Sequence, residues 1–239
     1  MNRTTSMFRR DWLAFAMATG MALSGTAAVA QKAATAEGAA IAPVLVLGDS
    51  LSAEYGLPRG TGWVALMEAR LKASGQSLPV VNASISGETT AGGLSRLPSL
   101  LQSHRPQLVV VELGANDALR GLSLKVTQEN LSRIVSLAQA QKARVLLVGM
   151  RMPPNFGQRY ADQFAALFQA VAKAQQVPLV PFMLEGVADR SDARDWFQAD
   201  GIHPLAKAHP LILDRNLWPA LKPLLPAGKG SASASRRGG

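Results

Sequence analysis

The stretch Val44-Leu45-Val46-Leu47-Gly48-Asp49-Ser50-Leu51-Ser52 places a short apolar run directly before a turn that carries a serine. The run Val44–Gly48 does not alternate between polar and apolar residues, which is typical of a strand covered on both faces. Similar runs rich in Val or Leu follow at Pro79–Ala83, Leu108–Glu112, Arg144–Val148 and Pro178–Val180. Together the five runs predict a buried parallel sheet.

Amphipathic segments separate these runs and predict helices over residues 62–74, 91–103, 127–142, 160–175 and 205–221. Thr127 is the expected N-cap of the third helix, and Pro98 is expected to bend or divide the second. Strands that alternate with helices predict a three-layer α/β/α sandwich around a five-stranded parallel sheet. Sites in such sheets form at the carboxyl ends of the strands.

Polar residues follow the first three predicted strands, at the carboxyl ends where sites form in such sheets. Asp49 and Ser50 follow the first strand, Gly87 follows the second in a polar turn, and Asn116 follows the third. A later segment, Asp200-Gly201-Ile202-His203-Pro204, adds a carboxylate and an imidazole. A serine hydroxyl needs a neighbouring base to accept its proton near neutral pH, and a neutral imidazole suits that task.

The short spacing between Asp200 and His203 lets one turn place the carboxylate beside the imidazole, where it would fix the tautomer. Only two other histidines are present. We expect His104 to be a solvated helix-end residue and His209 to have a surface or packing role. Ser50, His203 and Asp200 are therefore the predicted catalytic residues of a serine hydrolase.

The four segments that carry Ser50, Gly87, Asn116 and the Asp200–His203 pair resemble, in order and spacing, the four sequence blocks of the SGNH (GDSL) hydrolases. The resemblance is strongest to their periplasmic thioesterase and arylesterase subfamily. The resemblance covers residues 43–225 and implies a flavodoxin-like α/β fold. It also implies an oxyanion hole made of the Ser50 and Gly87 backbone N–H groups and the Asn116 side-chain amide. The alternative is that Gly87 only permits a turn and Asn116 only caps one.

Several neighbouring polar residues are expected to be structural. The chain lacks the G-x-S-x-G elbow of α/β-hydrolases, so the turn after the first strand must present Ser50. We expect Asp49 to tie down this turn, and Ser52 and Asp117 to form hydrogen bonds without reacting.

The segment after the fourth strand bears on the substrate. Met152, Pro153 and Phe156 are expected to line a mobile loop over an apolar acyl group, because in the resembling enzymes this loop moves over the acyl chain. The alternative is an ordinary connector. Glu54 stands where relatives often carry a small residue, so access beside Ser50 is expected to differ.

Both ends of the chain are predicted to be separable from the domain at 43–225. Residues 1–30 read as a secretory signal peptide, with three arginines before an apolar run and a small-residue cleavage pattern. The apolar run is too short for a membrane span, which needs about 20 residues. Residues 31–42 read as a linker and residues 226–239 as a disordered basic tail. We therefore expect a periplasmic or secreted protein without stable membrane insertion.

The net charge of +9 does not indicate nucleic-acid binding. Residues 1–30 contribute +2 and the tail +3, and the remaining +4 is scattered rather than clustered. The absence of cysteine excludes disulfides, thiolate catalysis and Cys-ligated zinc. No metal-ligand cluster or phosphate-binding glycine motif occurs, so we expect neither metal nor cofactor.

The predicted function is hydrolysis of acyl esters through an acyl-serine intermediate, on substrates such as aryl esters, acyl thioesters or lysophospholipids. One alternative is an O-acetyl esterase of carbohydrates or cell walls with the same residues. A more distant alternative is a non-catalytic α/β binding module. We expect a monomer, and the sequence leaves the physiological substrate open.

Overall fold

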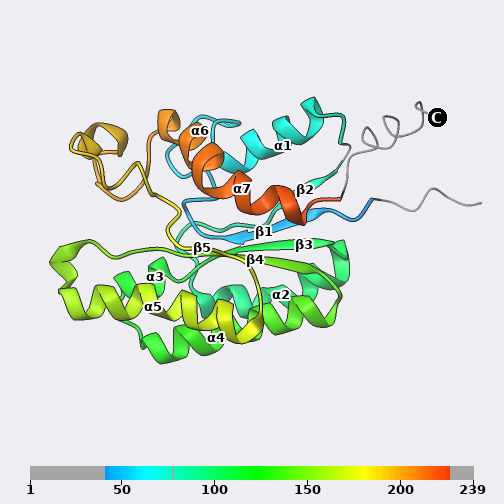
Figure 1. Ribbon diagram of the computed structural model, residues 1–239, viewed down its shortest axis with the longest axis horizontal. Helices are drawn as coiled ribbons and strands as arrows, with labels where there is room; N and C mark the ends of the chain where they lie inside the picture. The colour runs from blue at the N-terminus through cyan, green and yellow to red at the C-terminus, as the bar shows by residue number, and fades with distance from the viewer. Residues whose placement is uncertain (1–40, 77, 227–239) are drawn as a thin grey trace, which may run out of the picture. The chain divides into compact units, whose positions relative to one another are not determined.

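The computed structural model describes residues 41–76 and 78–226. Its centre is a five-stranded sheet in the order β2-β1-β3-β4-β5 (Figure 1). The strands are β1 (Val44–Gly48), β2 (Val80–Asn82), β3 (Leu108–Glu112), β4 (Arg144–Val148) and β5 (Leu179–Val180). Every pair of neighbouring strands is parallel. The predicted five-stranded parallel sheet is confirmed, although β2 and β5 are shorter than expected.

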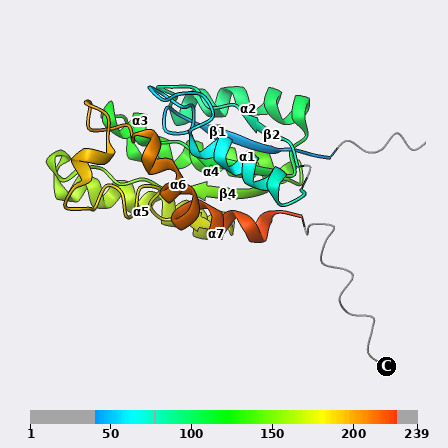
Figure 2. The ribbon, with the colours of Figure 1, turned by 90° about the horizontal axis from the view of Figure 1, so that it is seen from above.

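Helices cover both faces of the sheet. Helices α1 (Trp63–Ala73), α6 (His209–Leu211) and α7 (Trp218–Leu221) lie on one face (Figures 1 and 2). Helices α2 (Thr90–His104), α3 (Ala115–Leu119), α4 (Leu124–Ala140) and α5 (Gln158–Gln175) lie on the other. The predicted three-layer α/β/α sandwich is therefore confirmed.

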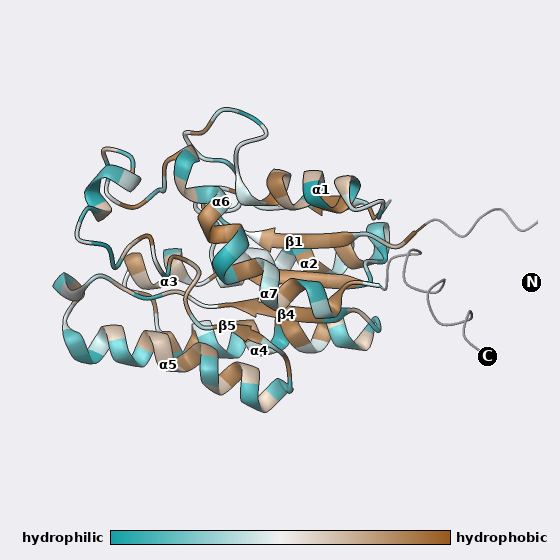
Figure 3. Ribbon diagram, turned by 45° about the horizontal axis from the view of Figure 1, so that its top comes forward, coloured by the Kyte–Doolittle hydropathy of each residue, from teal (hydrophilic) through white to brown (hydrophobic). Residues whose placement is uncertain are grey.

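The core lies between these layers. Figure 3 shows hydrophobic strands in the middle and helices in which hydrophobic and hydrophilic residues alternate. All residues of β1 and β3 are buried, because helices cover both faces of these central strands. This packing fixes the carboxyl ends of β2, β1 and β3 side by side, which is where the polar segments of the sequence begin.

Two details of the helix prediction are wrong. Helix α4 begins at Leu124 with Ser123 as its N-cap, so Thr127 lies inside the first turn, where its hydroxyl donates to the Ser123 carbonyl. The predicted helix over 205–221 is broken into α6, a π-helix at Ile212–Leu217, α7 and short 3₁₀ turns. Pro219 lacks an N–H and its ring would clash with the carbonyl four residues earlier, which accounts for the wider π turn before it.

Pro98 lies inside α2, which continues on both sides of it from Thr90 to His104. The predicted signal peptide, nearly all of the linker and the basic tail lie outside the described residues. Within the described ranges, none of the helices is long and apolar enough to cross a membrane.

Candidate active site

Ser50 lies in the tight turn that follows β1. The backbone N–H groups of Ser52 and Ala53 donate to the Asp49 carbonyl at 3.2 and 3.0 Å. The Asp49 side chain closes the same turn, because its Oδ1 accepts the Leu51 N–H at 3.0 Å. The predicted structural role of Asp49 in this turn is confirmed, and the Ser50 side chain is left partly accessible.

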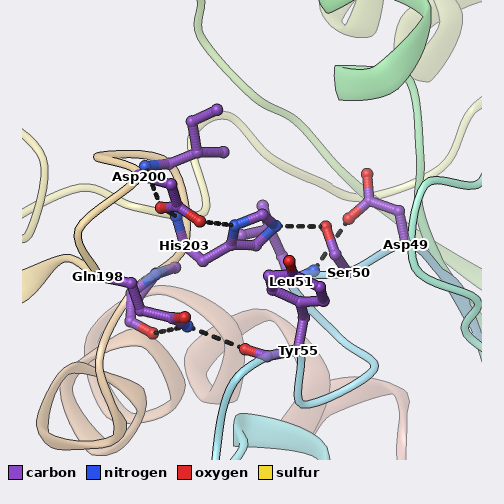
Figure 4. A network of polar contacts seen from close by, with 9 residues as sticks. Asp49, Ser50, Leu51, Tyr55, Gln198, Asp200 and His203 are labelled. Atoms are coloured by element: carbon purple, nitrogen blue, oxygen red, sulfur yellow. Dashed lines mark hydrogen bonds and ion pairs between the residues drawn. The ribbon is translucent and has the colours of Figure 1, made fainter.

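His203 and Asp200 meet Ser50 in a linear chain of hydrogen bonds (Figure 4). His203 Nε2 lies 2.8 Å from Ser50 Oγ, and His203 Nδ1 lies 2.7 Å from Asp200 Oδ2. When Nδ1–H donates to Asp200, Nε2 is left unprotonated and can accept the Ser50 hydroxyl proton. The structure thus brings together the three residues that the sequence predicted.

Asp200 is held by its own loop. Its Oδ1 accepts the backbone N–H groups of Ile202 at 2.9 Å and His203 at 3.0 Å. Desolvation acts to raise the pKa of Asp200, but these two N–H groups and the imidazole outweigh it and lower the pKa to about 2. A carboxylate that stays ionised at any working pH can keep the imidazole in one tautomer.

Two of the three predicted oxyanion donors, Gly87 and Asn116, follow the strands on either side of β1. Gly87 lies in the turn after β2 with φ near +79°, a conformation that favours glycine. Asn116 lies in α3, directly after β3, and its Nδ2 donates to Asp49 Oδ2 at 3.0 Å. One N–H of the amide is therefore anchored on Asp49, and the second remains for another acceptor.

A buried carboxyl pair behind the serine turn was missed by the sequence analysis. Glu112 pairs in register with Gly48 and is completely buried. Its Oε2 accepts the Ser52 hydroxyl at 2.7 Å, and Ser52 Oγ in turn accepts the Trp63 indole N–H at 3.1 Å. The position of Glu112 at the end of a buried strand was the signal that could have identified it.

Burial dominates the electrostatics of this pair. Desolvation raises the pKa of Asp49 to about 6, against the lowering effect of the Leu51 N–H and other hydrogen bonds. Desolvation, together with the nearby charge of Asp49, raises the pKa of Glu112 well above its ordinary value. Asp49 accepts hydrogen bonds with both oxygens, whereas Glu112 Oε1 is buried without a partner among the described atoms. The strongly raised pKa of Glu112 and its unpartnered Oε1 favour Glu112, rather than Asp49, as the member of the pair that holds a proton.

Asp117 is a hydrogen-bonding anchor, as expected. Its carboxylate accepts the Thr90 backbone N–H at 2.8 Å and the hydroxyls of Thr90 and Thr127. It therefore ties the start of α2 to α4 and holds α3, which carries Asn116, between them.

The loop after β4 contains the residues expected to cover an acyl group. Met152 is buried, Pro153 is exposed and the Phe156 side chain is 39% exposed. The covering role of this loop stays a prediction.

The Glu54 carboxylate accepts hydrogen bonds from a neighbouring loop. Its Oε1 accepts the N–H groups of Gly60 at 3.0 Å and Gly62 at 2.7 Å. An open hollow of about 650 Å³ lies beside this loop, lined by Ala53, Glu54, Leu57, Arg59, Gly60 and Asn82. Glu54 therefore shapes the surface next to the turn that carries Ser50.

The other two histidines lie away from this hydrogen-bonded chain, as expected. His104 is the last residue of α2. His209 is buried, and its Nδ1 accepts the Trp63 backbone N–H at 3.1 Å. Desolvation lowers the pKa of His209 to about 4, so the ring is neutral in the folded protein. Over residues 41–76 and 78–226, His, Asp and Glu side chains form no cluster of three that could hold a metal ion.

A Ser–His–Asp chain at the strand ends of an α/β sandwich defines a serine-hydrolase type of enzyme. The model of the GDSL-like lipase/acylhydrolase family matches residues 46–211. The chain belongs to this family and is an ester hydrolase, which confirms the resemblance found in the sequence.

The relatives agree with this assignment. The chain is 51% identical to esterase TesA of Pseudomonas aeruginosa over 187 residues, 78% of this chain and 91% of the relative. It is 43% identical to thioesterase 1/protease 1/lysophospholipase L1 of Escherichia coli over 193 residues, 80% of this chain and 88% of the relative. A crystal structure of TesA, 51% identical, superposes with a TM-score of 0.73 and covers 77% of this chain and 99% of its own.

Proposed function

We propose that Ser50, His203 and Asp200 hydrolyse acyl esters and thioesters by two successive acyl transfers. The observation that carries the proposal is the unbroken chain from Ser50 Oγ to His203 Nε2 at 2.8 Å and from Nδ1 to Asp200 at 2.7 Å. These separations are short enough for direct proton transfer.

In the first transfer, His203 takes the hydroxyl proton while Ser50 Oγ attacks the substrate carbonyl carbon. The resulting imidazolium returns its proton to the departing alcohol or thiol, and the acyl group stays on Ser50. In the second transfer, His203 takes a proton from water, which attacks the acyl-serine. The tetrahedral intermediate that forms then collapses: the carboxylic acid leaves, and His203 returns the proton to Ser50 Oγ.

Both transfers develop negative charge on the carbonyl oxygen, which fixed donors must meet. We assign this role to the backbone N–H groups of Ser50 and Gly87 and to the free N–H of the Asn116 amide. The Asp49 carboxylate supports the assignment, because it holds the other N–H of Asn116 at 3.0 Å and limits rotation of the amide. The donors are then in place before the charge appears.

Exposed apolar side chains around the strand ends favour an apolar acyl group. Tyr55, Ile85, Leu119, Phe156 and Ile202 lie in the segments beside the proposed residues, and each is at least 37% exposed. The names of the relatives extend the proposed substrates to lysophospholipids. We assign Met152, Pro153 and Phe156 to a loop that closes over the acyl chain. An O-acetyl esterase would need no such apolar surroundings.

We further propose that the protein acts outside the inner membrane as a monomer. The basic and then apolar pattern of residues 1–30 supports export. Acyl-coenzyme A is a cytoplasmic metabolite, so export would favour lipid and ester substrates.

Hydrolysis of p-nitrophenyl esters from acetyl to palmitoyl, by the wild type and Ser50→Ala, tests the proposal. We expect turnover by the wild type that Ser50→Ala abolishes, with a higher kcat/KM for medium or long acyl groups than for acetyl. Activity that survives in Ser50→Ala would overturn the assigned nucleophile. A preference for acetyl esters alone would instead favour the O-acetyl esterase.

A further inference from the structure

The proposed nucleophile and its base come from segments that are far apart in the sequence. Ser50 belongs to the serine loop (residues 49–57), which follows β1, whereas His203 belongs to the histidine loop (residues 197–205). The 2.8 Å separation between Ser50 Oγ and His203 Nε2 therefore depends on how these two loops are held together.

Gln198 joins the two loops through its side chain. Its Nε2 donates to the backbone carbonyl of Tyr55 in the serine loop at 2.9 Å and lies 3.3 Å from the Pro204 carbonyl, beside His203 (Figure 4). The amide also packs tightly on Gly56, where a Cβ atom would overlap Gln198 Oε1. One amide group thus spans the boundary between the loops.

The backbone of Gln198 closes the histidine loop on itself. Its N–H donates to the His203 carbonyl at 2.8 Å, and its carbonyl accepts the Gly201 N–H at 2.9 Å. Phe197 and Pro204 form a β-bridge at the base of the loop. The position of Gln198 is therefore fixed relative to Asp200 and His203. A hydrogen bond from its side chain to the serine loop thus also constrains the position of the His203 imidazole.

Tyr55 receives this bond and touches both members of the proposed catalytic pair. Its N–H lies 3.4 Å from the Ser50 carbonyl, a weak bond. Its ring lies 4.4 Å from the His203 ring, centroid to centroid, with the planes tilted by 39° (Figure 4). The ring covers one face of the imidazole although 49% of Tyr55 is exposed.

We propose that Gln198 and Tyr55 are positioning residues that set the distance and orientation between His203 and Ser50. This inference rests on the proposed function. Gln198 fixes the separation of the two loops, and the Tyr55 ring restricts rotation of the imidazole out of the Ser50–Asp200 line. A misplacement of about 1 Å in such a pair can lower the rate roughly 100-fold, so one amide bond can carry a large kinetic effect.

The test compares kcat and KM of the wild type and Gln198→Met on the best p-nitrophenyl ester. Methionine keeps the length of the side chain but removes its hydrogen-bond donor. Gln139→Met is the matched control, because Gln139 Nε2 also donates to a backbone carbonyl, that of Gln175, at 3.0 Å on the surface between α4 and α5. We expect Gln198→Met to lower kcat roughly 10- to 100-fold with KM within about threefold. Gln139→Met should keep the wild-type kcat.

The Tyr55 ring is tested separately. Tyr55→Ala should lower kcat about 2- to 10-fold, the usual worth of one aromatic contact, and Tyr55→Phe should restore most of this loss because the ring alone makes the contact. The rate of Ser50 modification by a neutral phosphonate ester should fall in parallel with kcat, since it needs the same base. If Gln198→Met does not fold, Gln198→Asn, which keeps the amide but is one methylene too short, replaces it.

Two results would overturn the inference. A wild-type kcat in the Gln198 variant would show that the bond does not position the pair. A rise in KM that accounts for the whole loss of kcat/KM would make these residues substrate contacts instead. Ser50→Ala is measured alongside: an inert wild type or an active Ser50→Ala sinks the proposed function, whereas normal behaviour of both with an unaffected Gln198 variant sinks only the positioning role.

Discussion

Replacing Glu112 with glutamine tests the buried carboxyl pair behind the serine turn. Glu112 has no exposed surface, accepts the Ser52 hydroxyl at 2.7 Å and faces the Asp49 carboxylate. Glutamine has the shape of a protonated glutamic acid and cannot ionise. Glu112→Gln therefore removes the titration of this group while the volume of the side chain is kept.

The expected effect on stability follows from the direction of the pKa shift. The folded-state pKa of Glu112 is raised above 4.5, so the folded protein binds this proton more tightly than the unfolded chain does. Its stabilising contribution is complete below the unfolded-state pKa and is lost as pH rises towards the folded-state pKa. The wild type should lose about 1.4 kcal/mol of unfolding free energy per pH unit relative to Glu112→Gln in that range.

The assay is urea unfolding followed by tryptophan fluorescence at pH 5, 6, 7 and 8. We expect the free energy of unfolding of Glu112→Gln minus that of the wild type to increase with pH and then level off. The pH at which it levels off reports the titration of the coupled pair, not of Glu112 alone. Glu68→Gln, on the exposed side of α1, controls for the loss of one acidic side chain. A difference that stays constant from pH 5 to 8 would refute the protonated state of Glu112.

Three further outcomes follow from the site and its surroundings. Asn116→Ala should lower kcat roughly 10²- to 10³-fold in the p-nitrophenyl assay, and a loss below tenfold would remove its amide from the oxyanion hole. Asp200→Asn should lower kcat about 10⁴-fold, because the amide favours the wrong imidazole tautomer, and near-normal turnover would contradict its role. The pKa of His209 is lowered from 6.5 to about 4, so its contribution to stability is complete above pH 6.5 and lost as pH falls to 4. Urea titrations should show the wild type losing about 3 kcal/mol over this window relative to His209→Asn, which keeps an acceptor for Trp63 N–H; equal losses would mean that His209 does not titrate there.

The sequence predicted the parts of the fold that local rules determine. Apolar runs such as Val44–Gly48 and Leu108–Glu112 matched strands residue for residue, because strands buried on both faces must be continuously apolar. The predicted N-cap at Thr127 was wrong because α4 begins earlier, with Ser123 as its N-cap, and this leaves Thr127 inside the helix next to Asp117. The predicted continuous helix over 205–221 was wrong because Pro219 interrupts the backbone hydrogen bonds, an effect that the apolar pattern does not reveal.

The candidate site likewise contains residues that the sequence predicted and residues that it did not. Ser50, Asp200 and His203 were accessible from the sequence because each carries a chemical group that hydrolysis requires. The bridging role of Gln198 was not accessible, and for Glu112 the sequence offers only its position at the end of a buried strand, because the role of a bridging amide or a buried acid depends on its partners. Their partners lie 143 and 60 residues away in the chain. No local spacing rule reaches that far.

This division has a mechanical consequence. Gly87, Ser50 and Asn116 follow the three adjacent strands β2, β1 and β3, so sheet register fixes their relative positions. His203 lies on a loop that does not follow a strand of the sheet, and in the described part of the chain side chains join this loop to the serine loop, namely Gln198, Tyr55 and the Ser50–His203 pair. Substitutions of buried residues that pack against the sheet should therefore lower the free energy of unfolding first, and should lower activity only when the fold is weakened. Substitutions at the boundary between the two loops should lower kcat while the free energy of unfolding stays nearly constant, because the side chains at that boundary are partly exposed and bury little apolar surface.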